Sequence, residues 1–362
     1  MTVMARALRR FFISLLVVFN VVVIALMLLS GYSGYFSPED YPLLNLSGLI
    51  FPLFLALDIL MVLVWLFVRK RMMLLPIAGL LLAFPPVRTY VPINLNTPPP
   101  EGSLKVLSFN VFLWAGWEYK KTGSNPIVDY LVASDADIIC LQEASPHEYD
   151  PRLIDEALNP LYPYRDSIMY RHDGDCLAIY SRFPILGSER ISYSSKGNQS
   201  MASRLLIDGD TVLVVNNHLE TVGFSMHEKK LFNQMVEGKK PKVKKRHFLS
   251  KLKIAQSKRA PQADAVARYI AEKGGEHVIV CGDFNDSPLS YAHHTIGRGL
   301  RDCFVASGTG FGYTFERYGM HVRIDNIFCS KTYDAYNCQV DRSVTASDHY
   351  PIYCWIKRRA NP

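Results

Sequence analysis

Three long apolar runs dominate the first ninety residues. Residues 11–29 contain no charged side chain, and as a helix these 19 residues would span about 28 Å, close to the thickness of a membrane core. Residues 43–68 form a second run with a single acid, Asp58. The third run, 72–87, is shorter and contains three prolines. We predict that the first two runs cross a membrane, and that the third crosses it or forms a re-entrant or interfacial segment.

The basic residues around these runs predict an orientation. Arg6, Arg9 and Arg10 precede the first run, residues 69–71 follow the second, and residues 30–46 contain neither Lys nor Arg. Positively charged loops stay in the cytoplasm. A multi-pass inner or plasma membrane protein is therefore predicted, with its C-terminal part on the outer, periplasmic or extracellular face if the third run crosses, and in the cytoplasm if it does not. The first run is not read as a signal peptide, because no A-x-A cleavage site follows it.

Asp58 lies in the middle of an apolar run. A carboxyl group in a membrane is costly and marks either a functional position or a bond between helices. No other ionisable residue in the runs offers a proton relay. We therefore expect Asp58 to form a helix–helix hydrogen bond within a small bundle.

The pattern changes after a proline-rich stretch. We assign residues 1–90 to a membrane anchor of two or three helices, 91–103 to a linker, and 104–362 to a globular domain. Within that domain, β-branched and apolar runs predict strands at 104–112, 137–142, 176–183, 201–207, 211–218, 277–284, 323–329 and 350–357. Helices are predicted at 126–134, where Asn125 and Pro126 form a start signal, at 151–158 and at 248–273. Many strands with few helices between them indicate an α/β fold of two sheets flanked by helices.

The charge of the chain is concentrated in one insertion. The whole chain has a formal net charge of +7. Residues 227–259 contain twelve Lys and Arg against two Glu, so the remainder of the protein is slightly acidic. This basic insertion is either a solvated segment or a contact for anionic lipid headgroups or a phosphate backbone.

The cysteines do not predict a metal or disulfide framework. There are seven, without CxxC or CxxH spacing, which disfavours a zinc site. Cys140, Cys281 and Cys354 lie in apolar runs, where a buried thiol is the ordinary outcome. Cys338 and Cys354 could form a pair outside the cytoplasm.

Polar residues recur where the predicted strands end. They are, with the segments that hold them, Asn110 (SFN), Glu143 (CLQE), His218 (NNHLE), Asp283 and Asn285 (GDFND), Asp325 (RIDNIF), and Asp348 and His349 (SDH). We expect the strands of one sheet to bring them together at one edge. Carboxylates and amides suit Mg²⁺ or Mn²⁺, and a hard cation beside two imidazoles suits phosphate ester hydrolysis.

Residues 104–357, about 70% of the chain, resemble the endonuclease/exonuclease/phosphatase superfamily of DNase I-like proteins, here in a membrane-anchored, bacterial-type form. The GDFN and SDHYPI segments are the most specific signals, and all the segments occur in the family's order. The resemblance implies a four-layer α/β sandwich and Mg²⁺-dependent attack of water on a phosphoester. One departure is Asn217, which stands where the family often has Thr before the histidine; we expect activity to survive it.

The resemblance implies a metal site for Mg²⁺ or Mn²⁺. Glu143 would be its main ligand, and Asn110 would assist. Asp348 would lie beside the cation. These assignments rest on the positions of the three residues in the family's segments.

The resemblance also implies the catalytic roles. Asp283 would orient or deprotonate the attacking water, and Asn285 would hold the water and the phosphate. His349 would stabilise the transition state and would be oriented by Asp325. His218 would contact the scissile phosphate.

Two further polar segments carry weaker signals. His172, Asp173 and Asp175 precede a predicted strand, and we expect them to form a solvated turn. His293 and His294 follow the GDFND segment. They line the rim of the cleft or, as we favour, form a surface pair.

The sequence supports two hypotheses about function. In the first, the protein is a membrane-anchored Mg²⁺-dependent phosphoesterase whose partners are the lipid bilayer and a phosphodiester, either nucleic acid or a phospholipid headgroup. In the second, it is an inactive binding or scaffold protein that keeps the fold. The presence of Glu143, Asp283, Asp348 and His349 favours the enzyme. The sequence predicts no oligomeric state.

Overall fold

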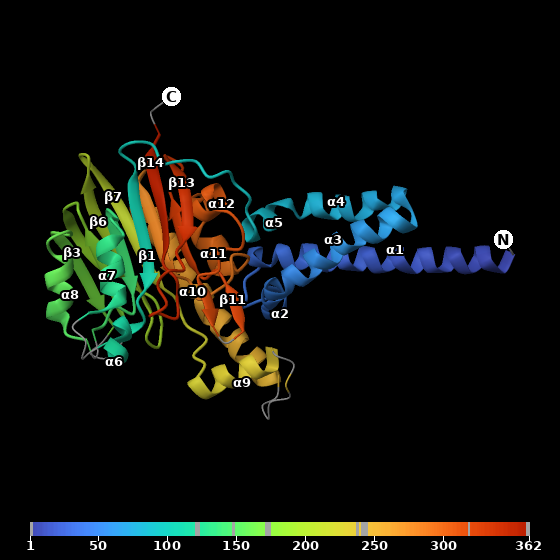
Figure 1. Cartoon of the computed structure of the whole chain (residues 1–362), viewed down its shortest axis with the longest axis horizontal. Helices are drawn as coiled ribbons and strands as arrows, with labels where there is room; N and C mark the ends of the chain where they lie inside the picture. Colours follow the sequence, from blue (N-terminus) through green and yellow to red (C-terminus); the bar gives the residue numbers. More distant parts are fainter. Residues whose placement is uncertain are drawn as a thin grey trace.

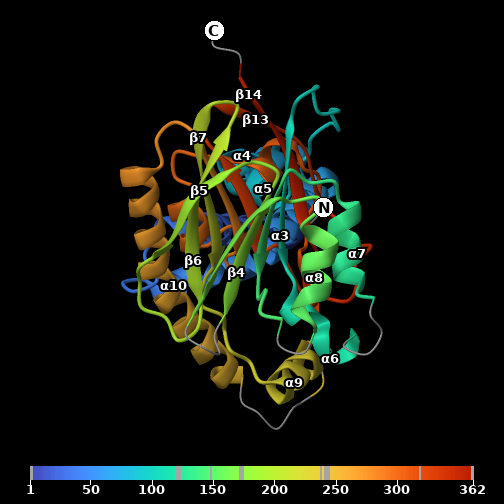
Figure 2. The same ribbon diagram turned by 90° about the vertical axis from the view of Figure 1, so that its left-hand side faces the viewer.

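A computed structural model of the chain describes residues 3–119, 124–146, 149–170, 175–236, 239, 245–317 and 319–359. Figure 1 shows a globular α/β part from which the N-terminal helices extend to one side. Two large mixed sheets face each other in the globular part, and helices cover their outer faces, as Figure 2 shows.

The first sheet has the strand order β13-β14-β1-β2-β4-β3. Its strands are β1 (Leu104–Asn110), β2 (Ile138–Gln142), β3 (Tyr164–Met169), β4 (Cys176–Ser181), β13 (Tyr333–Val340) and β14 (Ile352–Arg358). Only the β1–β2 pair is parallel. β14 and β4 run antiparallel to their neighbours β1 and β2, so they begin at the edge where β1 and β2 end.

The second sheet has the order β5-β6-β7-β8-β12-β9. Its strands are β5 (Ile185–Ile191), β6 (Gln199–Ile207), β7 (Asp210–His218), β8 (Val278–Asp283), β9 (Arg301–Asp302) and β12 (Asp325–Cys329). β7 and β8 are parallel, whereas β12 is antiparallel to β8. A separate hairpin consists of β10 (Phe315–Arg317) and β11 (Met320–Val322).

Three apolar clusters hold four layers together. The central cluster lies between the sheets and includes Ile138, Met201 and Cys281. The outer face of the first sheet packs under α7 (Pro126–Ala133) and α8 (Pro151–Leu158). The outer face of the second sheet packs under α10 (Lys245–Lys273) and α11 (Tyr291–Ile296). The four-layer α/β sandwich that the resemblance implied is therefore confirmed.

Strands buried on both faces explain the continuous apolar runs in the sequence. In β8, Ile279 and Cys281 belong to the central cluster, whereas Val278 and Val280 belong to the outer one. Side chains of a strand alternate between its two faces, so a strand covered on both sides needs apolar residues at successive positions.

Of the short helices, α7 and α8 begin where the sequence predicts. The Asn125 side chain accepts a hydrogen bond from the Ile127 amide at 2.9 Å and caps α7, as is usual for an N-cap. The remaining short helices of the globular part are η4 (Phe112–Ala115), α6 (Gly116–Tyr119), α9 (Met226–Val236) and α12 (Cys303–Ser307).

The sequence did not predict the strands β3, β5 and β13. All three are edge strands, and most of their side chains are only partly buried. An edge strand can carry polar and charged residues on positions that a central strand fills with apolar ones. Their composition therefore resembles that of loops.

The N-terminal part consists of helices α1 (Val3–Gly31), α2 (Pro42–Ser47), α3 (Phe51–Val68), α4 (Leu74–Leu82) and α5 (Phe84–Tyr90), with short turns η1 (Ser33–Tyr35), η2 (Gly48–Ile50) and η3 (Lys70–Met73). Two segments, Arg6–Gly31 and Pro42–Val68, are long and apolar enough to cross a membrane. The third apolar run is a helix pair, Lys70–Leu82 and Phe84–Tyr90, bent by 63°. It is one broken span or a re-entrant loop.

Asp58 forms the helix–helix contact expected of it. The Asn20 amide on α1 donates to the Asp58 carboxylate at 3.1 Å. The same Asn20 accepts a hydrogen bond from the indole of Trp65 at 3.0 Å. All three side chains are buried, so this polar group joins α1 to α3.

The anchor docks on the globular part. The Asn94 amide donates to the Gly308 carbonyl at 2.6 Å, so the segment predicted as a linker lies on the domain surface. The buried Arg323 guanidinium donates to the Thr89 carbonyl on α5 at 2.6 Å. In the turn η1, a side chain at Gly34 would approach the Leu289 carbonyl oxygen to 2.7 Å. The close approach requires a residue without a side chain at this point.

The expectation of a surface pair at His293 and His294 is wrong. His293 is buried and lies 3.0 Å from the Asp302 carboxylate. The His294 ring contacts the Tyr35 ring of η1, with centroids 3.9 Å apart. The anchor covers this face of α11, which the sequence of the domain alone does not indicate. All seven cysteines are free, buried thiols, in agreement with the expectation for Cys140, Cys281 and Cys354.

Candidate active site

Residues from both sheets converge at one edge of the sandwich. Strands β1, β7 and β8 end there with Asn110, His218 and Asp283. Strand β12 begins there, and its first residue, Asp325, is the register partner of Asp283. The expectation that one sheet delivers every polar residue from a strand end is therefore wrong. Two sheets contribute. The antiparallel strand β12 begins with Asp325, and His349 lies just before the antiparallel strand β14.

A glycine permits the close pairing of β7 and β8 at this edge. His218 and Asp283 are register partners, and Gly282 lies opposite Asn217. Gly282 has a φ of +125°, and a side chain there would approach the Asn217 carbonyl oxygen to 2.0 Å. Glycine is the residue that accepts this backbone conformation and this approach.

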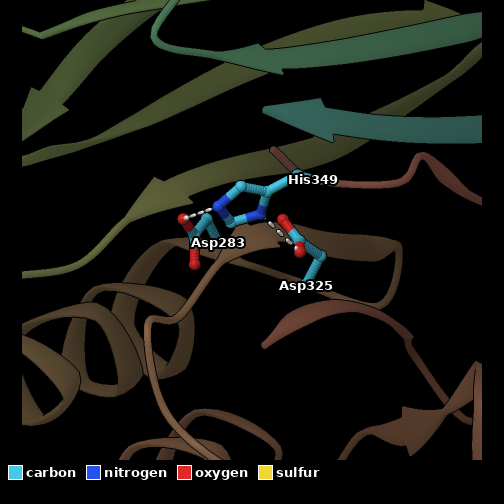
Figure 3. A group of neighbouring side chains, drawn as sticks. All are labelled: Asp283, Asp325 and His349. Carbon is cyan, nitrogen blue, oxygen red and sulfur yellow. Dashed lines mark hydrogen bonds and ion pairs between the residues drawn. The ribbon is translucent and has the colours of Figure 1, made fainter. Parts of the chain in front are cut away.

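Asp283, Asp325 and His349 form the centre of the site (Figure 3). The His349 Nδ1 lies 2.9 Å from an Asp325 oxygen, and its Nε2 lies 3.7 Å from an Asp283 oxygen. All three side chains are almost fully buried. Burial alone lowers the pKa of His349, but the facing carboxylates of Asp325 and Asp283 outweigh it and raise that pKa to about 10. The imidazole is therefore protonated at neutral pH.

These three groups are closer to a catalytic arrangement than to a cation site. Their potential ligand atoms lie within 4.8 Å of one another. However, Asp325 occupies the Nδ1 of His349, and the Asp325 amide is itself held by the Thr314 hydroxyl at 3.0 Å. A histidine oriented by a carboxylate, with its second nitrogen facing a reactive group, is the arrangement found in acid–base catalysis.

His218 lies on the other side of Asp283. Its Nε2 is 3.7 Å from an Asp283 oxygen and 3.9 Å from a Glu143 oxygen, and its Nδ1 is 3.0 Å from an Asp175 oxygen. Burial lowers the pKa of His218, but the three carboxylates together raise it to about 10. Asp283 thus lies between two cationic imidazoles.

Asp175 is a site residue that the sequence did not predict. It was expected in a solvated turn, yet its carboxylate is buried between His218 and the Glu143 amide, which donates to it at 3.1 Å. The reason is strand direction. Asp175 directly precedes β4, which runs antiparallel to β2, so it lies at the edge where β2 ends. His172 and Asp173 fall outside the described residues.

Glu143, Asn110 and Asp348 form the part of the site that suits a cation. The Asn110 amide lies 3.2 Å from an oxygen of Glu143 and 3.2 Å from one of Asp283. Burial raises the pKa of Glu143, and the nearby negative charge of Asp348 adds to the rise, against the effect of His218. Partly buried carboxylates that repel one another, next to an amide, are a donor set that fits a hard divalent cation.

Backbone strain accompanies two of these residues. Glu143 has a φ of +51° and Asn285 a φ of +52°, a left-handed conformation that costs roughly 1–2 kcal/mol for a residue with a side chain. Such residues concentrate at functional sites. In Asn285 this conformation directs its amide N–H to Asp283 at 2.8 Å and its side chain to the Leu219 carbonyl at 3.0 Å.

Two further polar residues, Ser347 and Asn217, bond to the backbone of strands that end at the site. The Ser347 hydroxyl donates to the Asn110 carbonyl at 2.7 Å and accepts the His349 amide at 3.1 Å, which ties the loop before β14 to β1. Asn217, the departure from the family's pattern, bonds to the Cys281 carbonyl at 3.0 Å. It alternates with His218 along β7 and so lies on the opposite face. Its side chain is therefore not part of the site.

The comparisons with known proteins agree with this fold. Residues 107–349 match the profile of the Endonuclease/Exonuclease/phosphatase family, so the chain belongs to this family. Residues 10–90 match a domain of unknown function. No curated protein matches the chain in sequence.

Several solved structures share the fold. D. rerio TDP2 humanized by 14 mutations superposes with a TM-score of 0.50 at 19% identity, over 70% of this chain and 99% of that one. The human Nocturnin catalytic domain with bound sulfate gives 0.50 at 17%, over 72% and 97%. A Bacteroides thetaiotaomicron mannosyl-6-phosphatase gives 0.49 at 22%, over 70% and 100%. Family and fold together define this protein as a phosphoester hydrolase.

Proposed function

We propose that the protein is a membrane-anchored, metal-dependent phosphoesterase that hydrolyses a phosphodiester by attack of water. The observation that carries the proposal is the position of Asp283. It is a buried carboxylate with the two imidazoles of His218 and His349 each 3.7 Å from one of its oxygens. A base flanked by two cations, at the edge of the two sheets, is suited to a reaction in which negative charge develops on phosphate oxygens.

Glu143, Asn110 and Asp348 would hold the cation, Mg²⁺ or Mn²⁺. When bound, the metal neutralises phosphate charge and lowers the pKa of coordinated water. The negative charge of Asp348 near Glu143 supports this assignment, because a bound cation would add to the positive charge that His218 and Lys229 already place beside these carboxylates.

Asp283 would accept the proton of the attacking water. Burial raises the pKa of Asp283, although the two histidines oppose the rise, so it is a stronger base than an exposed aspartate. The Asn285 amide binds one of its oxygens at 2.8 Å. The other oxygen accepts hydrogen bonds from the side-chain amides of Asn110 at 3.2 Å and Asn285 at 3.3 Å and faces both histidines, and it is the oxygen that would take the proton.

His349 and His218 would stabilise the negative charge of the transition state. Each presents its Nε2 to the space beside Asp283, and each is held at its Nδ1 by a carboxylate, Asp325 or Asp175. The two carboxylates fix the imidazole orientations and keep the rings protonated, so a phosphoryl oxygen at this position would meet two N–H donors.

We propose that the helices of the anchor place the site at the surface of an inner or plasma membrane, with the globular domain on the outer face. The two apolar segments support membrane insertion. The basic residues in the first turns of α1 and directly after α3 support a cytoplasmic position for the start of α1 and the end of α3. Whether the bent third segment crosses the membrane then determines on which side of the membrane the globular domain lies.

The test uses the full-length protein in lipid nanodiscs with Mg²⁺ and bis(p-nitrophenyl) phosphate as a soluble diester. Chelation by EDTA should abolish turnover, and Mg²⁺ or Mn²⁺ should restore it. Asp283→Asn should lower kcat by about 10²–10⁴-fold. The matched control is Asp208→Asn, an exposed aspartate in the turn between β6 and β7. Full turnover in EDTA, or equal activities of the two variants, would refute the proposal.

A further inference from the structure

An apolar cavity of about 300 Å³ lies beside the candidate active site. Its apolar walls come from three parts of the chain. Phe224 and Phe232 belong to the segment at α9, Met320 and Ile324 lie at β11 and just after it, and Leu49 belongs to η2 in the anchor. None of the roles proposed above uses this cavity.

The cavity shares two walls with the active site. Asn285, whose amide binds Asp283, lines the cavity with its other side. Phe315 also lines it, and the Phe315 ring contacts the His349 imidazole with centroids 5.2 Å apart. If the phosphate of a substrate lies beside Asp283, one of the groups esterified to that phosphate therefore lies next to the cavity.

One wall belongs to a candidate membrane span. Leu49 is part of the apolar segment Pro42–Val68, and 38% of its surface is exposed. The neighbouring helix α2 packs against α10. The cavity is therefore continuous with the part of the chain that would meet the bilayer.

The apolar lining is held in place. The rings of Phe224, Phe232 and Phe248 form a cluster with centroids 5.5–5.9 Å apart. Lys251 of α10 bridges to Glu228 of α9 at 2.8 Å. These contacts fix α9 against α10. The walls of the cavity are therefore held by specific side-chain contacts.

The charged groups of the cavity are paired or lie toward the metal-binding side. Arg259 is buried and bonds Asp286 at 3.0 Å, so it adds no free charge. The Lys229 ammonium lies 3.8 Å from an Asp348 oxygen, between the cavity and the proposed cation ligands. A phosphate would meet the cationic end, and an uncharged substituent would meet the apolar end.

We infer that the substrate is a phosphoester lipid, whose phosphate lies beside Asp283 and whose apolar chain begins in this cavity. The inference rests on the proposed phosphoesterase function and selects among its substrates. A single-stranded nucleic acid binds through a cationic track for its backbone and aromatic rings that stack on its bases, whereas the rings of this cavity pack against one another or against His349. Aliphatic walls from Leu49, Met320 and Ile324, joined to a membrane span, fit a hydrocarbon chain instead.

The test compares two soluble lipids with the same headgroup, dibutanoyl and dihexanoyl phosphatidylglycerol, using the full-length protein. Each methylene transferred into an apolar site contributes about fourfold to binding. The longer lipid should therefore have a kcat/KM about tenfold higher or more. Phosphorus NMR follows the products and detects cleavage on either side of the phosphate. Single-stranded DNA is the competing substrate.

Two variants in different elements probe the cavity. Met320→Gln and Leu49→Gln should each bring the ratio of the two lipids toward one, with turnover of bis(p-nitrophenyl) phosphate unchanged. Leu43→Gln is the control, since Leu43 is 78% exposed on α2 and does not line the cavity. Thermal unfolding of each variant confirms that it is folded.

The outcomes separate this inference from the proposed function. Turnover of the soluble diester with equal kcat/KM for both lipids, or cleavage of DNA but not lipid, would overturn the lipid assignment alone. If no phosphoester is cleaved, the phosphoesterase proposal fails. A diazirine derivative of the dihexanoyl lipid then tests the cavity by itself. Labelling at Phe224 or Met320 would support the lipid site, and labelling elsewhere would overturn it.

Discussion

Three buried histidines in the described part of this protein pair with an aspartate, and two of these pairs, at His349 and His293, differ in what surrounds them. His349 lies 2.9 Å from Asp325, and His293 lies 3.0 Å from Asp302. Both imidazoles are less than a tenth exposed, at 5% and 7%. By distance and burial alone, the two pairs are equivalent.

The second nitrogen and the other contacts distinguish them. The His349 Nε2 faces Asp283, 3.7 Å from its carboxylate. The His293 ring packs against Phe328 at 5.0 Å between centroids, and Asp302 also caps α12 by accepting the Val305 amide at 2.9 Å. A histidine–aspartate pair can therefore act in catalysis only if the second nitrogen of its histidine faces a reacting group. Otherwise it stabilises the fold.

The largest expected effect separates the two pairs directly. His349→Ala should lower kcat on bis(p-nitrophenyl) phosphate by about 10²–10⁴-fold, because it removes a charged N–H donor beside Asp283. His293→Ala should leave kcat near the wild-type value. Both are measured in nanodiscs at saturating Mg²⁺, with thermal unfolding to confirm folding. Equal losses in the two variants would mean that the pairs do not differ as we describe.

A smaller effect is expected at Asp175, which positions His218. Asp175→Asn keeps an acceptor for the Glu143 amide but removes the negative charge beside Nδ1. We expect kcat to fall by about 10–100-fold, as for other carboxylates that orient a functional histidine. Because the Asp175 charge raises the pKa of His218, now about 10, its removal lowers that pKa. Activity should then be lost at a lower pH on the alkaline side of the profile.

Asp166→Asn is the matched control for Asp175. Asp166 lies on the edge strand β3 and accepts the amide of Ser167, away from His218. Its substitution should change neither kcat nor the pH profile. An unchanged alkaline limb in Asp175→Asn, despite reduced activity, would indicate a merely structural role for Asp175.

The smallest effect concerns stability at the second pair. Burial raises the pKa of Asp302, but the His293 bond and the charges of His293 and Arg323 outweigh it and hold that pKa below its usual value. The ionised carboxylate therefore stabilises the fold above the unfolded pKa of about 3.9, and this stabilisation is lost as pH falls further. Asp302→Asn should flatten the loss of stability below about pH 5.

A second substitution isolates the helix cap of Asp302. Asn is as good an N-cap as Asp, whereas Ala is not, so Asp302→Ala should be less stable than Asp302→Asn by about 1 kcal/mol. Denaturant unfolding at neutral pH measures the difference. Equal stability of the two variants would show that the bond to the Val305 amide contributes nothing.

The sequence located much of the fold and the site because buried strands and short functional segments leave local signals. The strands that supply Asn110, His218 and Asp283 are covered on both faces and read as continuous apolar runs. The edge strand β3 was missed because its side chains are partly exposed and polar. Helix α7 was predicted because Asn125 and Pro126 are a local start signal.

Residues that belong to the site through strand direction were harder to find. Asp175 has no motif of its own, and its turn could be solvated as easily as buried. It reaches His218 because β4 runs antiparallel to β2. A single sequence shows where a strand is, whereas its direction relative to its neighbours depends on pairings between distant segments.

By itself, the sequence determined the apolar helices of the anchor, the buried strands and the kinds of polar residue that the site contains, since each depends on neighbours along the chain. Only the tertiary structure decided that two sheets, rather than one, deliver those residues. It also decided that His293 packs against Phe328 while His349 faces Asp283, and that Leu49 lines a cavity beside the site. These features are contacts between segments far apart in sequence, and packing, not local preference, fixes them.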